Sequence, residues 1–234
     1  MHIEMWTDFA WPFCYIGKRR LEDALKKINQ HVEVTYRSFE LDPTLPRDVN
    51  KNMYEALADK YGMSIEQAKA NTQNMVQMAK ETGLEYNMDS LILTNTFDAH
   101  RLVMFAKQQG KMHEMTERIL YAYFTESKHI GDHETLVELA VEVGLDREAV
   151  ANMLGSDEMK AEVHEDENLA RQYGIRSVPF FLINKKYALT GAQPTETFVQ
   201  ALQKVLEEEK ESITVLNTED GIVCDENGCE IPKK

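Results

Sequence analysis

The pattern of hydrophobic and polar positions gives the chain two sheet-forming ends and a helical middle. Residues 2–7 predict a strand, and residues 32–39 alternate with period two and are rich in β-branched and aromatic side chains, which indicates a second. Between them, apolar positions at helical spacing predict a helix over residues 13–29, with Pro12 in its first turn. Strand, helix and strand in this order open a parallel sheet.

The middle of the chain, from about residue 45 to residue 174, has helical periodicity almost throughout. Ser64 and Gln67 have the spacing of a capping box, and glycines such as Gly62 and Gly144 stand where helices should end. The predicted helices cover residues 50–61, 65–82, 95–109, 112–127, 133–143, 147–154 and 157–173. This stretch is therefore a candidate insertion into the α/β part.

Sheet character returns near the C-terminal end. Residues 178–184 form a short apolar run typical of a buried strand, and residues 187–189 are its expected hairpin partner across a turn at Lys185-Lys186. A closing helix is predicted over residues 195–211. Residues 212–234 have little apolar content and are expected to form a loosely attached tail.

Length and charge narrow the class of protein. The 234 residues fit one large domain, or a domain with an inserted subdomain, and the net charge of -14 argues against binding to nucleic acid or to an anionic membrane. The chain starts without the basic and apolar regions of a signal peptide and has no run of ~20 apolar residues, so the expected location is the cytosol. In a reducing cytosol a disulfide is more often cycling than structural.

One cysteine, Cys14, falls in the first turn of the predicted helix over residues 13–29. Unpaired backbone N–H groups and the helix dipole favour an anion such as a thiolate at a helix start. A free cysteine is also a small apolar residue that is commonly buried. Its role stays open between these two interpretations, and Trp11 is either a pocket filler or an aromatic platform for a ligand.

The other two cysteines, Cys224 and Cys229, flank the turn-forming run Asp-Glu-Asn-Gly. Short apolar flanks predict a small hairpin that brings the two thiols within disulfide reach. Closing so small a loop would stabilise it by roughly 2 kcal/mol at most on the chain-entropy model, which favours a reversible disulfide. A structural clip and a weak zinc pair are the alternatives, and no metal site is expected because no histidine lies nearby.

Four separate segments resemble one family in the correct order. They are residues 8–21, ending in Cys-Tyr-Ile-Gly-Lys-Arg-Arg-Leu, then residues 95–102, 174–181 and 191–193. The chain is similar to the DsbA family of thiol-disulfide oxidoreductases, and most similar to its FrnE-like branch. The resemblance implies an α/β thioredoxin-like fold with an inserted all-helical domain. The implied division is residues 1–44 plus 175–216 for the thioredoxin-like domain, 45–174 for the helical domain and 217–234 for the tail.

The resemblance also implies where the site lies. The family normally carries Cys-x-x-Cys at the helix start, whereas here Trp11 stands at the first position and Cys14 at the second. Pro179 resembles the family's cis-proline, beside which the backbone of Val178 pairs with a thiol peptide or with glutathione. The implied substrate-binding residues are Trp11, Pro12, Phe13, Val178, Pro179, Asn95 and His100, the last two facing the junction from the inserted domain.

Three functions are compatible with these residues. The first is a thiol-disulfide oxidoreductase or isomerase that acts on thiol or disulfide substrates, protein or small molecule, through Cys14, Cys224 and Cys229 and without a cofactor. The second is a glutathione-dependent enzyme like kappa-class glutathione transferases and 2-hydroxychromene-2-carboxylate isomerases, although Trp11 lacks the hydroxyl used there. The third is a non-enzymatic peptide-binding or adaptor protein. No oligomeric state and no particular substrate is predicted.

Overall fold

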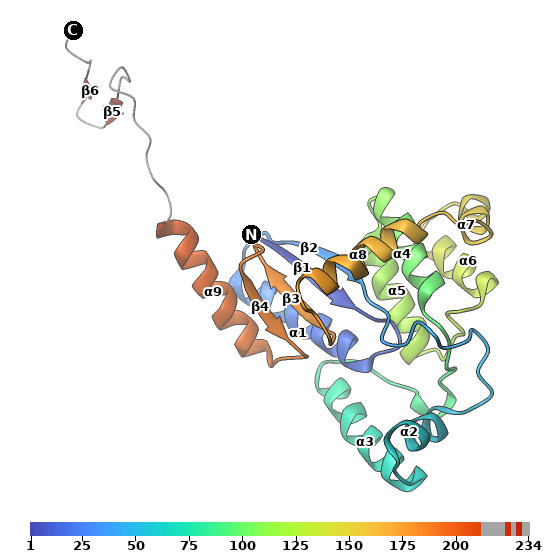
Figure 1. Cartoon of the computed structure of the whole chain (residues 1–234). Helices are drawn as coiled ribbons and strands as arrows, with labels where there is room; N and C mark the ends of the chain where they lie inside the picture. Colours follow the sequence, from blue (N-terminus) through green and yellow to red (C-terminus); the bar gives the residue numbers. More distant parts are fainter. Residues whose placement is uncertain (212–222, 226–227, 231–234) are drawn as a thin grey trace.

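A four-stranded sheet forms the centre of the thioredoxin-like part of the computed structural model, which describes residues 1–211, 223–225 and 228–230 (Figure 1). Its strands, in the spatial order β2-β1-β3-β4, are β1 (His2–Thr7), β2 (Glu33–Ser38), β3 (Phe180–Ile183) and β4 (Tyr187–Thr190). β1 pairs in parallel with β2 and antiparallel with β3, and β3 pairs antiparallel with β4. β1 is thus a central strand, which explains why its residues after His2 are all buried.

Two helices, α1 (Pro12–Ile28) and α9 (Thr195–Glu211), pack against each other beside this sheet. The ring of Phe198 on α9 meets Phe181 on β3 edge to face at 4.8 Å between centroids. α1 ends where Asn29 adopts a left-handed backbone with φ 50°. The predicted strand-helix-strand opening and the closing helix are confirmed.

The helices between β2 and β3 form the all-helical insertion (Figure 1). They are α2 (Met53–Tyr61), α3 (Ile65–Glu81), the 3₁₀ turn η1 (Met88–Ser90), α4 (Phe97–Gln108), α5 (Met112–Phe124), α6 (His133–Glu142), α7 (Arg147–Leu154) and α8 (Lys160–Gln172). α4 is the most buried and contacts α5, α6, α7 and α8, while α8 also packs against β2. The fold is therefore α/β, thioredoxin-like, with an inserted all-helical domain.

In the part of the chain that the structure describes, none of the helices has the length and apolar character needed to cross a membrane.

Most predicted helix ends are confirmed, but α2 begins at Met53 instead of residue 50, after the Asn52 cap, and α5 ends at Phe124 instead of residue 127. Ser64 and Gln67 form the expected capping box, and Gly62 ends α2 with φ 64°. α8 begins at Lys160, three residues later than the pattern predicts, because Met159 takes a left-handed backbone and the carbonyls of Ser156 and Glu158 accept hydrogen bonds from Arg101. The hydrogen bonds from Arg101 thus take the place of the predicted first turn of α8.

The β3-β4 hairpin is confirmed, but its turn lies one residue earlier than predicted. Asn184 and Lys185 have φ 49° and 54°, and Lys186 N–H donates to the Ile183 carbonyl at 3.0 Å. Two consecutive positive φ angles are typical of a type I′ turn, which favours asparagine at its first central position. Asn184 therefore belongs to the turn rather than to the strand.

A second, two-stranded sheet is described near the C-terminus. β5 (Val223–Asp225) and β6 (Gly228–Glu230) pair antiparallel, with Cys224 directly opposite Cys229 in the register. The predicted hairpin is thus present at the level of the backbone. The side chains of these two cysteines, the rest of the predicted tail and the predicted boundary at residue 217 lie outside what the structure describes.

Candidate functional site at the start of α1

The turn after β1 leads directly into α1. Trp11 N–H donates to the Asp8 carbonyl at 3.3 Å, and Cys14 N–H donates to the Trp11 carbonyl at 2.9 Å. Pro12 is the first residue of α1, where a missing N–H costs no helical hydrogen bond. The Pro12 carbonyl accepts a hydrogen bond from the hydroxyl of Tyr86 at 2.8 Å. The helix start is therefore held both from β1 and from the segment that follows α3.

The Cys14 side chain is completely buried beneath this start. It belongs to a small apolar cluster with Trp6, Val178 and Leu182, and Trp11 covers the cluster from its edge. Burial raises the pKa of the Cys14 thiol to about 12, despite the Asp8 N–H that donates to its Sγ at 3.4 Å. At pH 7 the buried Cys14 side chain is therefore almost entirely in its protonated thiol form.

The cis peptide bond expected beside α1 is present between Val178 and Pro179. Gly17, one turn into α1, lies against it, because a Cβ atom on Gly17 would come within 3.0 Å of Pro179 Cγ and 3.2 Å of Phe181 Cζ. The Pro179 carbonyl accepts the N–H of Gly191 at 2.8 Å. Helix α1 and the cis-proline are thus in direct contact, with no space for a side chain between them.

A buried carboxylate, Asp8, connects the site to the inserted helices. Its Oδ2 accepts the N–H of Leu41 at 2.7 Å, and its Oδ1 accepts the hydroxyl of Thr96 at 2.8 Å. His100 Nε2 lies 3.7 Å from the same Oδ1, too far for a hydrogen bond, and Nε2 has no other partner among the described residues. Burial opposes ionisation of Asp8, but the facing imidazole and these donors outweigh it and hold its pKa below the ordinary value.

A second carboxyl group lies next to Asp8 in the loop after β2. The Asn95 amide donates to Glu40 Oε2 at 3.3 Å. Burial raises the pKa of Glu40; the His100 imidazole opposes this change, whereas the nearby Glu167 and Asp8 carboxylates add to it. The result is an acid-rich polar cluster around one buried histidine, directly behind the turn that precedes α1.

The predicted site residues therefore divide into two groups. Trp11, Cys14 and Val178 share one apolar cluster, with Pro179 against α1. Phe13 contacts Trp11 at 5.7 Å between ring centroids but packs with the main core. Asn95 and His100 gather around Asp8 and Glu40 instead. Their predicted contacts with a substrate stay predictions.

Three residues that shape the site were missed by the sequence analysis. Asp8 accepts a hydrogen bond from Thr96, 88 residues away, and Glu40 accepts one from Asn95, 55 residues away, both donors lying in the segment that leads into α4. Gly17 could have been found, because a glycine inside a helical pattern often marks close packing.

Among the side chains that the structure describes, no group of three or more histidine, cysteine or acidic residues has metal-binding geometry.

The fold and the α1 start define a thioredoxin-like protein with a helical insertion. The model of the DSBA-like thioredoxin domain family matches residues 2–203, and the chain belongs to this family. A crystal structure of a probable DsbA oxidoreductase from Streptomyces coelicolor is 39% identical, covers 100% of both chains and superposes with a TM-score of 0.85.

Three further proteins are similar to this chain over most of its length, one in sequence and two in fold. The uncharacterized Bacillus subtilis protein YwbO is 28% identical over 86% of this chain and 96% of its own length. The cytosolic disulfide reductase DsbM from Pseudomonas aeruginosa, solved with GSH, is 18% identical, with coverage of 88% and 100% and a TM-score of 0.62. A 2-hydroxychromene-2-carboxylate isomerase is 14% identical, with coverage of 92% and 100% and a TM-score of 0.69.

Proposed function

We propose that this DsbA-family protein is a FrnE-like thiol-disulfide oxidoreductase or isomerase in which Cys224 and Cys229, rather than a cysteine at the start of α1, form the reactive pair. The observation that carries the proposal is the state of Cys14, which is sealed in an apolar cluster with a pKa of about 12. Trp11 occupies the position where the family places its attacking cysteine. The chain then has one remaining cysteine pair, opposite each other across β5 and β6.

The reaction we propose is ordinary dithiol-disulfide exchange. A thiolate of the reduced pair attacks one sulfur of a substrate disulfide, which forms a mixed disulfide and releases the other substrate sulfur as a thiolate. The second cysteine, after losing its proton to water, attacks the mixed disulfide. Two electrons have then passed to the substrate, both substrate thiols are free, and Cys224 and Cys229 are joined. Two molecules of a low-molecular-weight thiol of the cytosol then reduce the pair again and are themselves joined as a disulfide.

The α1 start supplies substrate binding in this proposal. Trp11 and Phe13 are both half-buried aromatic side chains at the helix start, so each keeps an exposed part for contact with an apolar segment. The Val178–Pro179 cis bond, held against Gly17, provides a rigid backbone edge beside them. We place the reaction in the cytosol, the compartment of the Pseudomonas disulfide reductase with this fold.

Disulfide mapping tests this proposal. The full chain is treated with diamide, digested without reduction and analysed by mass spectrometry, alongside the Cys14→Ala variant as the matched control. We expect a Cys224–Cys229 linkage in both proteins. Absence of this linkage, together with no insulin-reduction activity, would remove the proposal in favour of a non-enzymatic peptide-binding protein.

Glutathione-dependent catalysis is the second candidate, favoured by the cis-proline and by two fold neighbours, a disulfide reductase solved with GSH and an isomerase. It is disfavoured by Trp11, whose indole N–H donates but cannot accept a proton or attack. Calorimetry separates the two candidates. Glutathione that fails to bind at millimolar concentration rules out this alternative and leaves the first candidate untouched.

A further inference from the structure

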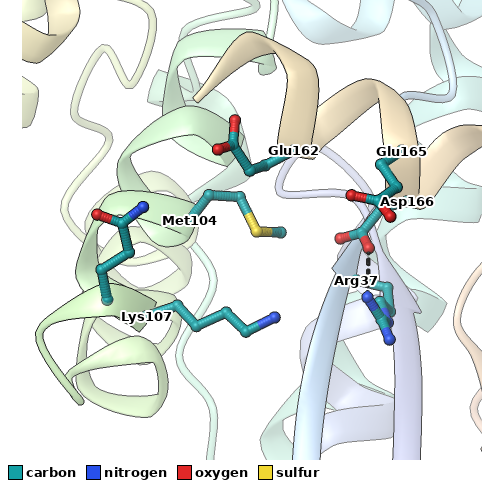
Figure 2. Close-up of a pocket in the computed structure, with 7 residues that line it drawn as sticks. Arg37, Met104, Lys107, Glu162, Glu165 and Asp166 are labelled. Atoms are coloured by element: carbon teal, nitrogen blue, oxygen red, sulfur yellow. Dashed lines mark hydrogen bonds and ion pairs between the residues drawn. The ribbon is translucent and has the colours of Figure 1, made fainter. Parts of the chain in front are cut away.

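A charged cavity lies away from the α1 start, between α4 and α8 above β2 (Figure 2). Its volume is about 360 Å³, at the lower end of the range for small-molecule sites. Its walls are Met104, Lys107 and Gln108 from α4 and Glu162, Glu165 and Asp166 from α8, with Arg37 of β2 as the floor. None of these residues belongs to the Cys14 cluster or to the polar cluster around Asp8.

The floor of the cavity is rigid. Arg37 donates from Nη1 to Asp166 Oδ1 at 2.7 Å and from Nε to Glu4 Oε1 at 2.9 Å, and Ser38 N–H donates to Asp166 Oδ2 at 2.9 Å. Asp166 is only 3% exposed, and its carbonyl also accepts the Trp6 indole N–H. Glu4 Oε2 is buried and has no hydrogen-bond partner in the described part of the chain. The carboxyl groups of Glu4 and Asp166 thus share the single guanidinium of Arg37. The floor therefore has two acidic groups for one basic group.

The rim of the cavity carries charged groups that nothing in the described structure neutralises by contact. Lys107, Glu162 and Glu165 have neither a hydrogen bond nor an ion pair among the side chains that the structure describes. Lys107 points from α4 toward Arg37 and Asp166, while the two glutamates stand on successive turns of α8 on the other wall (Figure 2). The rim of the cavity therefore carries charged side chains of both signs, exposed Lys107 on α4 and exposed Glu165 with half-buried Glu162 on α8.

We infer that this cavity binds a small zwitterion, namely a free amino acid or a short peptide. The ligand carboxylate pairs with Lys107, and the ligand ammonium pairs with Glu162 and Glu165, where the excess of carboxyl groups favours a cation. Arg37 keeps two of its five N–H donors for a ligand oxygen. The Met104 side chain supplies an adaptable apolar wall for the rest of the ligand.

The electrostatics of Asp166 agree with this geometry. Burial holds the pKa of Asp166 above its ordinary value, although the Ser38 N–H, the Arg37 guanidinium and the ammonium group of Lys107 act to lower it. The Lys107 ammonium thus interacts electrostatically with the Asp166 carboxyl group across the cavity, without a hydrogen bond or ion pair between them. A ligand ammonium beside Glu162 and Glu165 adds a further positive charge on the α8 side of the cavity.

Methyl NMR of the full chain tests the inference through the Met104 methyl group, assigned with the Met104→Leu variant. The probes are diglycine as the zwitterion, succinate as the carboxylate and 1,4-diaminobutane as the amine, each titrated to about 20 mM. We expect diglycine to shift the Met104 signal in a saturable way and at lower concentration than either other probe. Lys107→Gln and the double variant Glu162→Gln, Glu165→Gln should each weaken diglycine binding at least about fivefold.

Two exposed residues without contacts at the cavity, Lys80 and Glu138, provide the matched controls. Lys80→Gln and Glu138→Gln should leave the affinity for diglycine within about twofold of the parent protein. Equal binding of the diamine, with no effect of Lys107→Gln, would show a simple acidic surface and overturn the inference. Absence of a saturable shift with all three probes would do the same. These outcomes do not depend on cysteine chemistry or on the proposed oxidoreductase activity.

Discussion

At the scale of single residues, the position of a thiol within one helical turn decides its chemistry. The dipole and the free N–H groups act on the first residues of a helix, and their effect fades within a turn. Cys14 lies deeper, where loss of solvent outweighs the help from the Asp8 N–H. The family resemblance implies an attacking cysteine at position 11, where this chain has a tryptophan, and Trp11 packs against the cluster that contains Cys14.

Labelling of Cys14 should therefore be strongly protected. In the native protein we expect iodoacetamide to modify Cys14 at least about 1,000-fold more slowly than in 6 M guanidinium chloride, because reaction needs both opening of the cluster and loss of the proton. Mass spectrometry of peptides from a time course gives the two rates. Similar rates in the two conditions would show that the thiol is accessible and would contradict the burial described here.

The charge on Asp8 should stabilise the protein in a pH-dependent way. Because the folded-state pKa of Asp8 is lowered, its contribution is fully present above the unfolded pKa of about 3.9 and is lost as the pH falls through the folded value. We expect Asp8→Asn to reduce the free energy of unfolding by about 2 kcal/mol at pH 7. Urea unfolding of both proteins should show this difference shrinking below about pH 4. A constant difference from pH 7 to pH 3 would mean that the charge is not the stabilising feature.

At the scale of secondary-structure elements, two contacts hold the helices in place. One is the glycine contact between α1 and the Val178–Pro179 bond. The other is made by Arg101 of α4, which is 2% exposed. Its guanidinium donates to the carbonyls of Met153 and Ser156, each at 2.6 Å, and so holds the turn between α7 and α8. Both contacts join parts of the chain that are far apart in sequence.

Substitution of Gly17 by alanine separates helix propensity from packing. At an exposed helical position this change stabilises a protein by up to about 1 kcal/mol, but the new Cβ here meets Pro179 and Phe181. We expect a net loss of about 1–2 kcal/mol in urea unfolding. Lys26→Ala, an exposed substitution in the same helix, should change the free energy by less than about 0.5 kcal/mol. A more stable Gly17→Ala protein would show that α1 and Pro179 are not in close contact.

Removal of the Arg101 guanidinium should be much more damaging than removal of a surface arginine. Arg101→Met removes the donor shared by the carbonyls of Met153, Leu154, Ser156 and Glu158, two of these hydrogen bonds being buried, and should cost about 3 kcal/mol of unfolding free energy. Arg147→Met breaks only an exposed pair with Glu134 and should cost about 0.5 kcal/mol or less. Equal losses for the two variants in urea unfolding would contradict the role given to Arg101.

At the scale of the whole molecule, local patterns in the sequence predict most of the helices and strands. Capping at Ser64, the glycine stop at Gly62 and the alternation in β2 act between near neighbours, so they are readable from the chain itself. The late start of α8 was not predicted because Arg101, more than 50 residues away, takes the carbonyls of the missing turn.

The candidate site was predictable only in part for the same reason. Val178 and Pro179 lie where the family resemblance implies, with the expected cis bond. The placement of Asn95 and His100 around Asp8 depends on how α4 docks on the turn after β1, which no local pattern encodes. Burial of Cys14 likewise results from packing of Trp6 and Leu182, which come from two different strands.

The proposed function assigns thiol chemistry to Cys224 and Cys229 and not to Cys14. Insulin reduction with glutathione as the reductant tests it most directly, with the parent protein, Cys14→Ala and the double variant Cys224→Ser, Cys229→Ser measured side by side. We expect Cys14→Ala to keep at least about half of the parent rate and the double variant to fall to the rate of glutathione alone. Loss of activity in Cys14→Ala, with a double variant as active as the parent, would contradict the account.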